Sequence, residues 1–148
     1  MGTVKDFYTI PLNTRLLIEK QKHPRCDLKD SVQMNIHLII RTHFKEYRYD
    51  NSYGCMMWNK DYSTVTNVSQ WSDEIKELML SSIEKNELRI SNVKIDLTLE
   101  DAEISEHYKD HPLKLKKKIT IHITGIIKYL NEPLEHFEYL FFSPLSIG

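Results

Sequence analysis

Two segments of the chain repeat apolar residues at the helical spacing of three and four positions. In the first, Asp27 stands where a helix cap is expected, and the apolar positions are Leu28, Val32, Ile36, Ile39 and Ile40. In the second, one face carries Trp71, Ile75, Leu78, Met79 and Ser82. The pattern predicts two helices, near residues 27–43 and 69–85.

The first of these helices carries more apolar surface than one neighbour would cover. Its polar arc is narrow and is formed mainly by Asp30, Gln33, His37 and Arg41. Met34 and Leu38 form a second apolar stripe, beyond Ser31 and Asn35. Because one sheet would bury only the first stripe, we expect Met34 and Leu38 to remain uncovered by it.

Beyond Arg89 the hydrophobic period changes from the helical value to two, which is typical of half-buried strands. Alternating residues predict strands near 92–100, 117–129 and 134–142, with a turn at Asn131, Glu132 and Pro133 before the last strand. Short connections between successive strands favour an antiparallel meander. With both helices on one face, the predicted fold is α+β.

Three further segments complete a single predicted domain over residues 1–148. Residues 1–26 contain Pro11, Pro24 and mixed polarity without a clear period, which predicts an extended arm laid across the domain. The segment is too apolar for a disordered tail. Residues 45–62 are rich in aromatic side chains and predict an ordered loop or a short hairpin. Residues 101–117 divide into an acidic and a basic half, which is consistent with a solvated hairpin loop or with an arm that docks on a partner.

Composition narrows the possible partners and compartments. The 148 residues carry 20 Lys and Arg against 21 Asp and Glu, a formal net charge of −1, which argues against nucleic acid as a partner. Neither a membrane-spanning run nor a signal peptide is recognisable, so we expect a cytoplasmic protein without direct membrane insertion. Cys26 and Cys55 are the only cysteines, and we expect both to be buried, reduced thiols.

No catalytic constellation stands out in the sequence. Of the seven histidines, His107 and His111 have helical spacing but lack the intervening Glu of a zinc motif. A nucleophile motif is absent, and four glycines are few for a phosphate-binding loop. Carboxylate pairs are expected by chance among 21 acids, as with Asp50, Asp61, Glu84 and Glu87. The chain therefore shows no sign of a metal, a cofactor or an enzymatic activity.

Glu87 and Arg89 form the most informative charged pair. They lie two residues apart where the chain leaves the second predicted helix, and residues at this spacing in an extended segment point to the same side. Two interpretations remain open. The pair is either an ordinary surface ion pair, worth about 0–1 kcal/mol, or a functional element at a structural junction.

The chain resembles the baseplate wedge family of contractile tails, which includes the type VI secretion subunit TssE and its contractile-phage counterpart. The resemblance runs from about Phe7 to Ile147, through FYTIPLN, PRCDLKDSVQMNIHLIIRTHF, EYRYDNSYGCMMWNKDY and SIEKNELRISNVKIDL to FFSPLSIG. Its most specific parts are the capped apolar helix, the turn with Tyr53 and Gly54, and a Glu-Pro-Arg motif. Glu87 and Arg89 match the outer positions of that motif, while Leu88 replaces the proline.

This resemblance implies a structural, non-catalytic baseplate subunit. The family binds other wedge proteins, which in type VI systems are TssF and TssG, and helps to seat the first ring of the TssB and TssC sheath. The expected protein-binding residues are Glu87, Arg89, Tyr53, Gly54, Met34 and Leu38. Two alternatives remain: a lysozyme-like glycoside hydrolase, since some members once carried that label, and a baseplate protein of a phage tail or an extracellular injection system.

Overall fold

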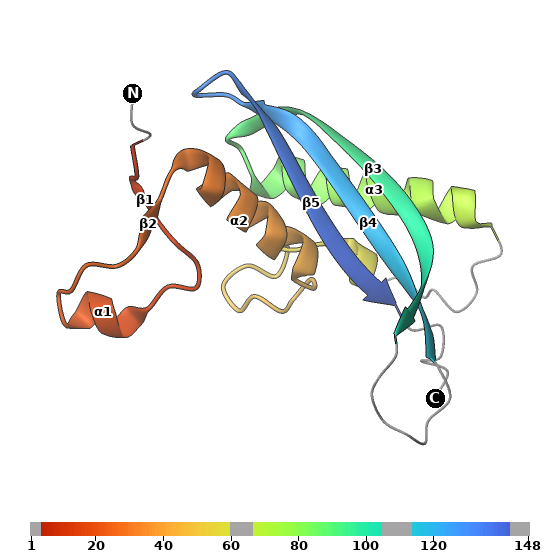
Figure 1. Ribbon diagram of the computed structural model, residues 1–148, viewed down its shortest axis with the longest axis horizontal. Helices are drawn as coiled ribbons and strands as arrows, with labels where there is room; N and C mark the ends of the chain where they lie inside the picture. Colours follow the sequence, from red (N-terminus) through yellow and green to blue (C-terminus); the bar gives the residue numbers. More distant parts are fainter. Residues whose placement is uncertain (1–3, 60–66, 105–113, 143–148) are drawn as a thin grey trace.

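The computed structural model describes residues 4–59, 67–104 and 114–142, and its centre is a three-stranded antiparallel sheet (Figure 1). The strands are β3 (Ile90–Ile104), β4 (Lys114–Ile127) and β5 (Glu132–Phe142), in the order β3-β4-β5. Each pairs with its neighbour along the chain. The predicted meander and the α+β fold class are therefore confirmed.

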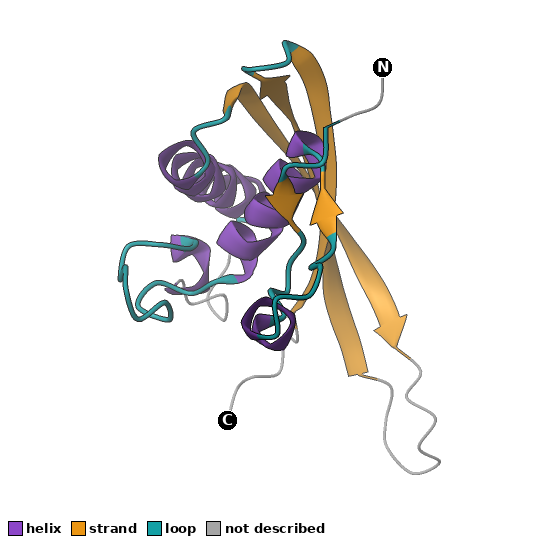
Figure 2. Ribbon diagram, turned by 90° about the vertical axis from the view of Figure 1, so that its left-hand side faces the viewer, coloured by secondary structure: helices purple, strands orange, loops and turns teal. Residues whose placement is uncertain are grey.

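Two long helices cover one face of this sheet (Figure 2). The helix α2 (Leu28–Arg41) begins after Asp27, whose side chain accepts a hydrogen bond of 2.8 Å from the backbone N of Asp30. The helix α3 (Val68–Asn86) begins after Asn67, which caps it in the same way. Both predicted helices are confirmed to within two residues at each end. A 3-10 helix, η1 (Met56–Asn59), ends the described part of the aromatic loop.

The hydrophobic core lies between the helices and the inner face of the sheet. Alternation along β3 and β4 holds as predicted: odd-numbered apolar residues face the helices, and the even-numbered residues between them are more exposed. The buried members on the helices and the sheet are Val32, Ile36, Ile39, Ile40, Ile75, Met79, Ile83, Ile90, Ile119, Ile121, Ile123, Ile127, Leu134 and Leu140. The helix faces that bury them are those that the period of 3.6 predicts.

Both cysteines are buried and free, as expected. Burial is the main cause that raises the pKa of the Cys26 thiol, aided by the charges of Asp30 and Asp27. Burial also raises the pKa of Cys55. Both thiols are therefore poor nucleophiles near neutral pH. None of the helices in the described ranges is long and apolar enough to cross a membrane.

The β3–β4 hairpin is longer than expected, so the predicted boundaries of the charged loop at 101–117 are wrong. Residues 101–104 and 114–117 continue the two strands. Opposite charges face each other across the pair: Glu100 lies opposite Lys118, and Asp101 lies opposite Lys117, with 3.5 Å between the Oδ1 and Nζ atoms of the latter pair. Such cross-strand pairs stabilise strands. The tip, residues 105–113, lies outside the described residues.

The turn between β4 and β5 also lies earlier than expected. It spans residues 128–131, and Asn131 has a positive φ of 51°, which Asn tolerates in turns. Glu132 and Pro133 already belong to β5. Proline is acceptable there because β5 is an edge strand.

The N-terminal segment is not an extended arm throughout, which corrects that prediction. Its strands β1 (Phe7–Tyr8) and β2 (Arg25–Cys26) pair antiparallel, and a short helix, α1 (Thr14–Ile18), lies between them. The chain folds back because Asn13 caps α1 and donates its backbone N–H to Nε2 of His23 at 2.8 Å. We call residues 4–26 the arm. Figure 1 shows it projecting beyond α2, away from the sheet.

Candidate protein-interaction site

Glu87 and Arg89 form a bidentate ion pair at the end of α3. Glu87 follows the helix in an extended conformation, which turns its carboxylate to the same side as the guanidinium two residues later. The Nε atom of Arg89 lies 2.8 Å from Oε1, and Nη2 lies 2.7 Å from Oε2. The backbone N–H of Arg89 also donates to Oε1 at 3.0 Å. Two parallel charge-assisted bonds fix the guanidinium in one orientation.

This pair is not an ordinary surface ion pair, so that interpretation is wrong. Glu87 is only 2% exposed, whereas the side chain of Arg89 keeps 33% exposure. Burial alone raises the pKa of Glu87, but the hydrogen bonds from Arg89 and Asn35 and the charge of Arg89 outweigh it, and the pKa lies below its usual value. The carboxylate is therefore a buried anion that its neighbours keep charged.

The helix α2 supplies two further hydrogen-bond partners of the pair. Asn35 donates through Nδ2 to Oε2 of Glu87 at 2.8 Å and to the backbone carbonyl of Asn86 at 3.2 Å. Arg89 donates through Nη1 to the hydroxyl of Ser31 at 2.9 Å. Two polar residues one turn apart on α2 thus bind the end of α3 and the start of β3. The pair fixes the junction between three elements.

The aromatic loop also reaches this network. The hydroxyl of Tyr53 donates to Oδ1 of Asn35 at 3.0 Å, so Tyr53 and Glu87 share one partner. Gly54 has a φ of +114°, and a Cβ there would lie 2.4 Å from the backbone oxygen of Thr42. Only glycine fits this position. Of the two forms considered for residues 45–62, the described part, up to residue 59, is a loop with η1 and not a hairpin.

Leu88 stands between the paired residues and points to solvent, with 71% of its surface exposed. The bidentate geometry of Glu87 and Arg89 forms without a proline at this position. The difference from the family motif therefore leaves the ion pair intact.

The second apolar stripe of α2 is divided between the arm and solvent. Met34 is half-buried, and its sulfur accepts a hydrogen bond of 3.4 Å from the backbone N of Ile10 in the arm. Leu38, one turn further on, is 36% exposed. The arm also reaches the ion pair, since the guanidinium carbon of Arg89 lies 5.6 Å from the ring centre of Phe7. The expectation of an uncovered stripe thus holds for Leu38 and not for Met34.

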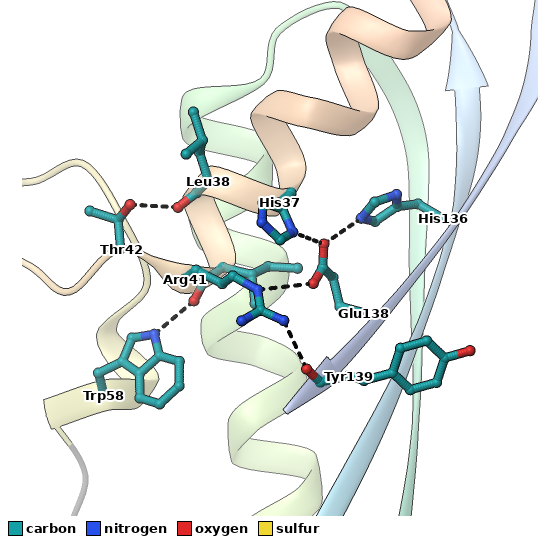
Figure 3. A network of polar contacts seen from close by, with 9 residues as sticks. His37, Leu38, Arg41, Thr42, Trp58, His136, Glu138 and Tyr139 are labelled. Atoms are coloured by element: carbon teal, nitrogen blue, oxygen red, sulfur yellow. Dashed lines mark hydrogen bonds and ion pairs between the residues drawn. The ribbon is translucent and has the colours of Figure 1, made fainter. Parts of the chain in front are cut away.

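A second buried carboxylate, Glu138 on β5, was not predicted (Figure 3). His37 on α2 and His136 on β5 contact its Oε1 through Nδ1 and Nε2, at 2.6 and 2.8 Å. The Nε atom of Arg41 donates to Oε2 of Glu138 at 3.3 Å, and Nη2 of Arg41 donates to the backbone oxygen of Tyr139. We call these four residues, His37, Arg41, His136 and Glu138, the Glu138 cluster. It fastens α2 to the edge of the sheet.

The Glu138 cluster keeps its carboxylate ionised, as the other pair does. Burial raises the pKa of Glu138. The hydrogen bonds from His136 and His37 and the charges of these residues outweigh that effect, so the pKa lies below its usual value. A general acid of a glycosidase needs the opposite shift. Both buried carboxylates are therefore ill suited to donate a proton near neutral pH.

One sequence signal pointed to this cluster. Gln33, His37 and Arg41 follow one another every four residues on α2 and form a polar arc in the sequence pattern. In the structure the arc faces β5, where Gln33 donates to the backbone oxygen of Glu135 at 2.9 Å. A buried Glu138 between Leu134 and Leu140 also required cationic partners.

The histidines do not gather into a metal site in the part of the chain that the structure describes. Within those residues, no group of three His, Cys, Asp or Glu side chains is arranged to hold a metal ion. His107 and His111 lie outside the described residues.

Comparison with known proteins gives one family match. The family model of the baseplate wedge protein gp25 matches residues 26–130. This range contains all six expected protein-binding residues and begins where the arm ends. No curated protein matches the chain.

Solved structures with similar chains include the following two. One is a protein from Geobacter sulfurreducens described as a "putative tail lysozyme", with 13% identity and a TM-score of 0.59, over 82% of this chain and 97% of that one. At this identity the match shows a shared fold. The other belongs to the baseplate complex of the type VI secretion system, with 18% identity and a TM-score of 0.41, over 74% of this chain and 91% of that one.

Proposed function

Because the chain belongs to the baseplate wedge protein gp25 family, we propose that it is a non-catalytic structural subunit of a contractile-tail baseplate. The observation that carries this proposal is the family match over residues 26–130. In the specific form that we propose, the chain acts like TssE in a type VI secretion system. It binds TssF and TssG at the cytoplasmic side of the inner membrane and seats the first ring of TssB and TssC.

The protein-binding site that we propose is the surface around Arg89, with Tyr53, Met34 and Leu38 beside it. Gly54 is buried and contributes by shaping the loop that carries Tyr53. A guanidinium has five N–H groups, and the contacts of Arg89 with described residues occupy three of them. The other two remain for carbonyl or carboxylate groups of a partner. A guanidinium that a buried carboxylate already orients loses little freedom on binding and suits a hot spot worth about 2 kcal/mol.

The electrostatics favour a structural role over glycoside hydrolysis. A retaining or inverting glycosidase requires one carboxyl group that stays protonated near neutral pH. The pKa values of Glu87 and Glu138 are both lowered, and each carboxylate is occupied by cationic or amide donors. In this proposal these carboxylates hold α2 in place.

A binding experiment with surface variants tests the proposed site. Purified TssF and TssG from the same host are titrated with the wild-type chain and with Leu38→Asp, which alters an exposed residue and leaves the core unchanged. We expect Leu38→Asp to weaken binding at least about tenfold. Phe141→Asp, at a 52% exposed position on the sheet face away from the helices, is the matched control and should bind normally. Equal binding of TssF and TssG by all three proteins would exclude the surface that contains Leu38 as the binding site.

A turnover assay tests the non-catalytic part of the proposal. The purified chain is incubated with peptidoglycan fragments, and released sugars are measured. We expect no turnover. Hydrolysis that disappears in Glu87→Gln or Glu138→Gln, while both variants remain folded, would replace the structural role with an enzymatic one.

A further inference from the structure

The arm exposes most of its apolar side chains. Within residues 4–26 only His23 and Cys26 are buried, and α1 contains no buried residue. Exposed fractions of 37–79% are found for Val4, Tyr8, Ile10, Leu12, Leu17 and Ile18. A segment with so many exposed large apolar residues is typical of a protein-binding surface.

The arm has a defined conformation although it has no core of its own. The pairing of β1 with β2 is extended by a backbone hydrogen bond of 3.1 Å from Thr9 to Pro24. Inside this closure, the ring of His23 accepts the backbone N–H of Asn13. Polar contacts thus fix the shape and leave the apolar side chains outside. A surface that is ordered before binding loses little conformational entropy when a partner covers it.

The charge of the arm is opposite to that of the rest of the chain. Residues 1–26 contain five basic and two acidic residues, a net charge of +3, which leaves 15 basic and 19 acidic residues, a net charge of −4, for residues 27–148. Arg15 is neutralised by Glu19, with 2.8 Å between Nε and Oε1. Lys20 and Lys22, which follow α1, form no ion pair with any residue that the structure describes. A partner surface complementary to the arm would carry carboxylates around an apolar centre.

The arm is continuous with the proposed protein-binding site. Phe7 lies against the guanidinium of Arg89, and Ile10 binds the sulfur of Met34. A partner that covers Leu38 and Arg89 would therefore meet the arm next. Since the family model begins at residue 26, this additional surface lies outside the region that the family match covers.

We propose that the arm is a second docking surface of this subunit and binds an acidic, apolar patch on a wedge protein of the same baseplate. This inference rests on the proposed function. The arm extends the contact made around Arg89 with an apolar centre, Leu12 and Ile18, and a basic rim, Lys20 and Lys22. Residues 26–130, which the family model matches, make the contact with wedge proteins that we propose around Arg89, and the arm increases the affinity for the same partner.

The test uses the full chain and purified TssF and TssG from the same host. One variant replaces the apolar centre (Leu12→Ser with Ile18→Ser), and the other reverses the rim (Lys20→Glu with Lys22→Glu). Each should lower affinity about tenfold or more, and the loss in the rim variant should shrink as salt increases, because exposed charges are screened. Phe141→Ser and Lys94→Glu, both at exposed positions outside the arm, are the matched controls and should bind normally. Thermal melts confirm that all variants are folded.

The possible results separate the arm from the proposed function. Arm variants that bind like wild type, while Leu38→Asp fails to bind, would overturn the arm proposal and leave the baseplate role intact. A wild-type chain that binds no wedge protein would overturn both. The arm proposal is also overturned if the arm variants affect only self-association, measured by light scattering, or only sedimentation with anionic phospholipid vesicles.

Discussion

In the part of the chain that the structure describes, two carboxylates are buried, Glu87 and Glu138, and they fasten the same helix at two places and with different partners. Glu87 is neutralised by an arginine two residues away, and α2 adds only the neutral side chains of Ser31 and Asn35. Glu138 lies on the edge strand and depends on His37 and Arg41, about 100 residues earlier in the sequence, together with His136. The first pair is local, and the second is created by the fold.

The comparison shows how differently two buried anions depend on their surroundings. A guanidinium is charged at every accessible pH and orients a carboxylate through two parallel bonds. The Glu138 cluster spreads its compensation over three side chains, so that each of them is less essential. Loss of the single cation beside Glu87 should therefore cost more stability than loss of any single member of the Glu138 cluster.

The largest effect is expected for Arg89→Ala. The variant leaves Glu87 buried without a cation, and the free energy of unfolding should fall by about 3 kcal/mol. Arg89→Lys should recover only part of this loss, because an ammonium lacks the bidentate geometry. Chemical denaturation measures both variants. Arg15→Ala, which breaks the exposed pair with Glu19, is the control and should cost less than about 1 kcal/mol. If Arg89→Ala and Arg15→Ala lower the free energy of unfolding equally, burial of Glu87 does not make its ion pair more important for stability than an exposed pair.

The next effect concerns the loop that supports Glu87. Gly54→Ala places a methyl group against the backbone oxygen of Thr42 at a positive φ, and we expect a loss of about 2 kcal/mol. The unfolding midpoint in denaturant measures it. Gly125→Ala is a useful comparison, because its Cβ would lie 3.2 Å from the nearest atom and its φ is not positive. A smaller loss at Gly54 than at Gly125 would contradict the described loop geometry.

For Glu138→Gln we expect a loss of about 1.5 kcal/mol near neutral pH, because charge-assisted hydrogen bonds become neutral ones. The pKa of Glu138 is lowered in the folded state. The stabilisation is therefore complete above the unfolded pKa of about 4.3 and is lost as the pH falls through the folded pKa. The difference between wild type and variant should narrow on acidification. A constant difference from about pH 6 to pH 3 would show that the charge of Glu138 contributes nothing.

The smallest effect is expected for Tyr53→Phe. This variant removes the hydrogen bond to Asn35 and leaves the direct contacts of Glu87 in place. The cost should be about 1 kcal/mol, as for one neutral hydrogen bond. Asn35→Ala should cost more, since it also removes the bond to Glu87. If both cost the same, Asn35 acts only through Tyr53. Thermal melts of the single variants and of the double variant decide this.

The sequence predicted those parts of the structure that depend on local rules. Both long helices follow from the spacing of their apolar residues and from the cap at Asp27, and the meander follows from alternation and short connections. The geometry of Glu87 and Arg89 was also predictable, since it requires only an extended segment. Their burial was not, because it depends on α2, which lies more than 45 residues earlier.

The Glu138 cluster could not be derived in the same way. Its formation requires the register of β5 on β4 and the position of α2 beside the sheet edge, and neither is encoded in a short motif. The conformation of the arm is not predictable from local rules for a related reason. Pro11, Pro24 and mixed polarity suggested extension, whereas the observed closure depends on Asn13 and His23 meeting across ten residues.

The most direct test of the account is the composition of the native complex. The full chain is tagged in its own host, purified at low salt, and its partners are identified and quantified by mass spectrometry. We predict wedge proteins of one contractile-tail baseplate in fixed stoichiometry, with weaker recovery from the Leu38→Asp strain. A chain recovered without any baseplate protein from cells that assemble the machine, or recovered with peptidoglycan-degrading activity, would contradict the account.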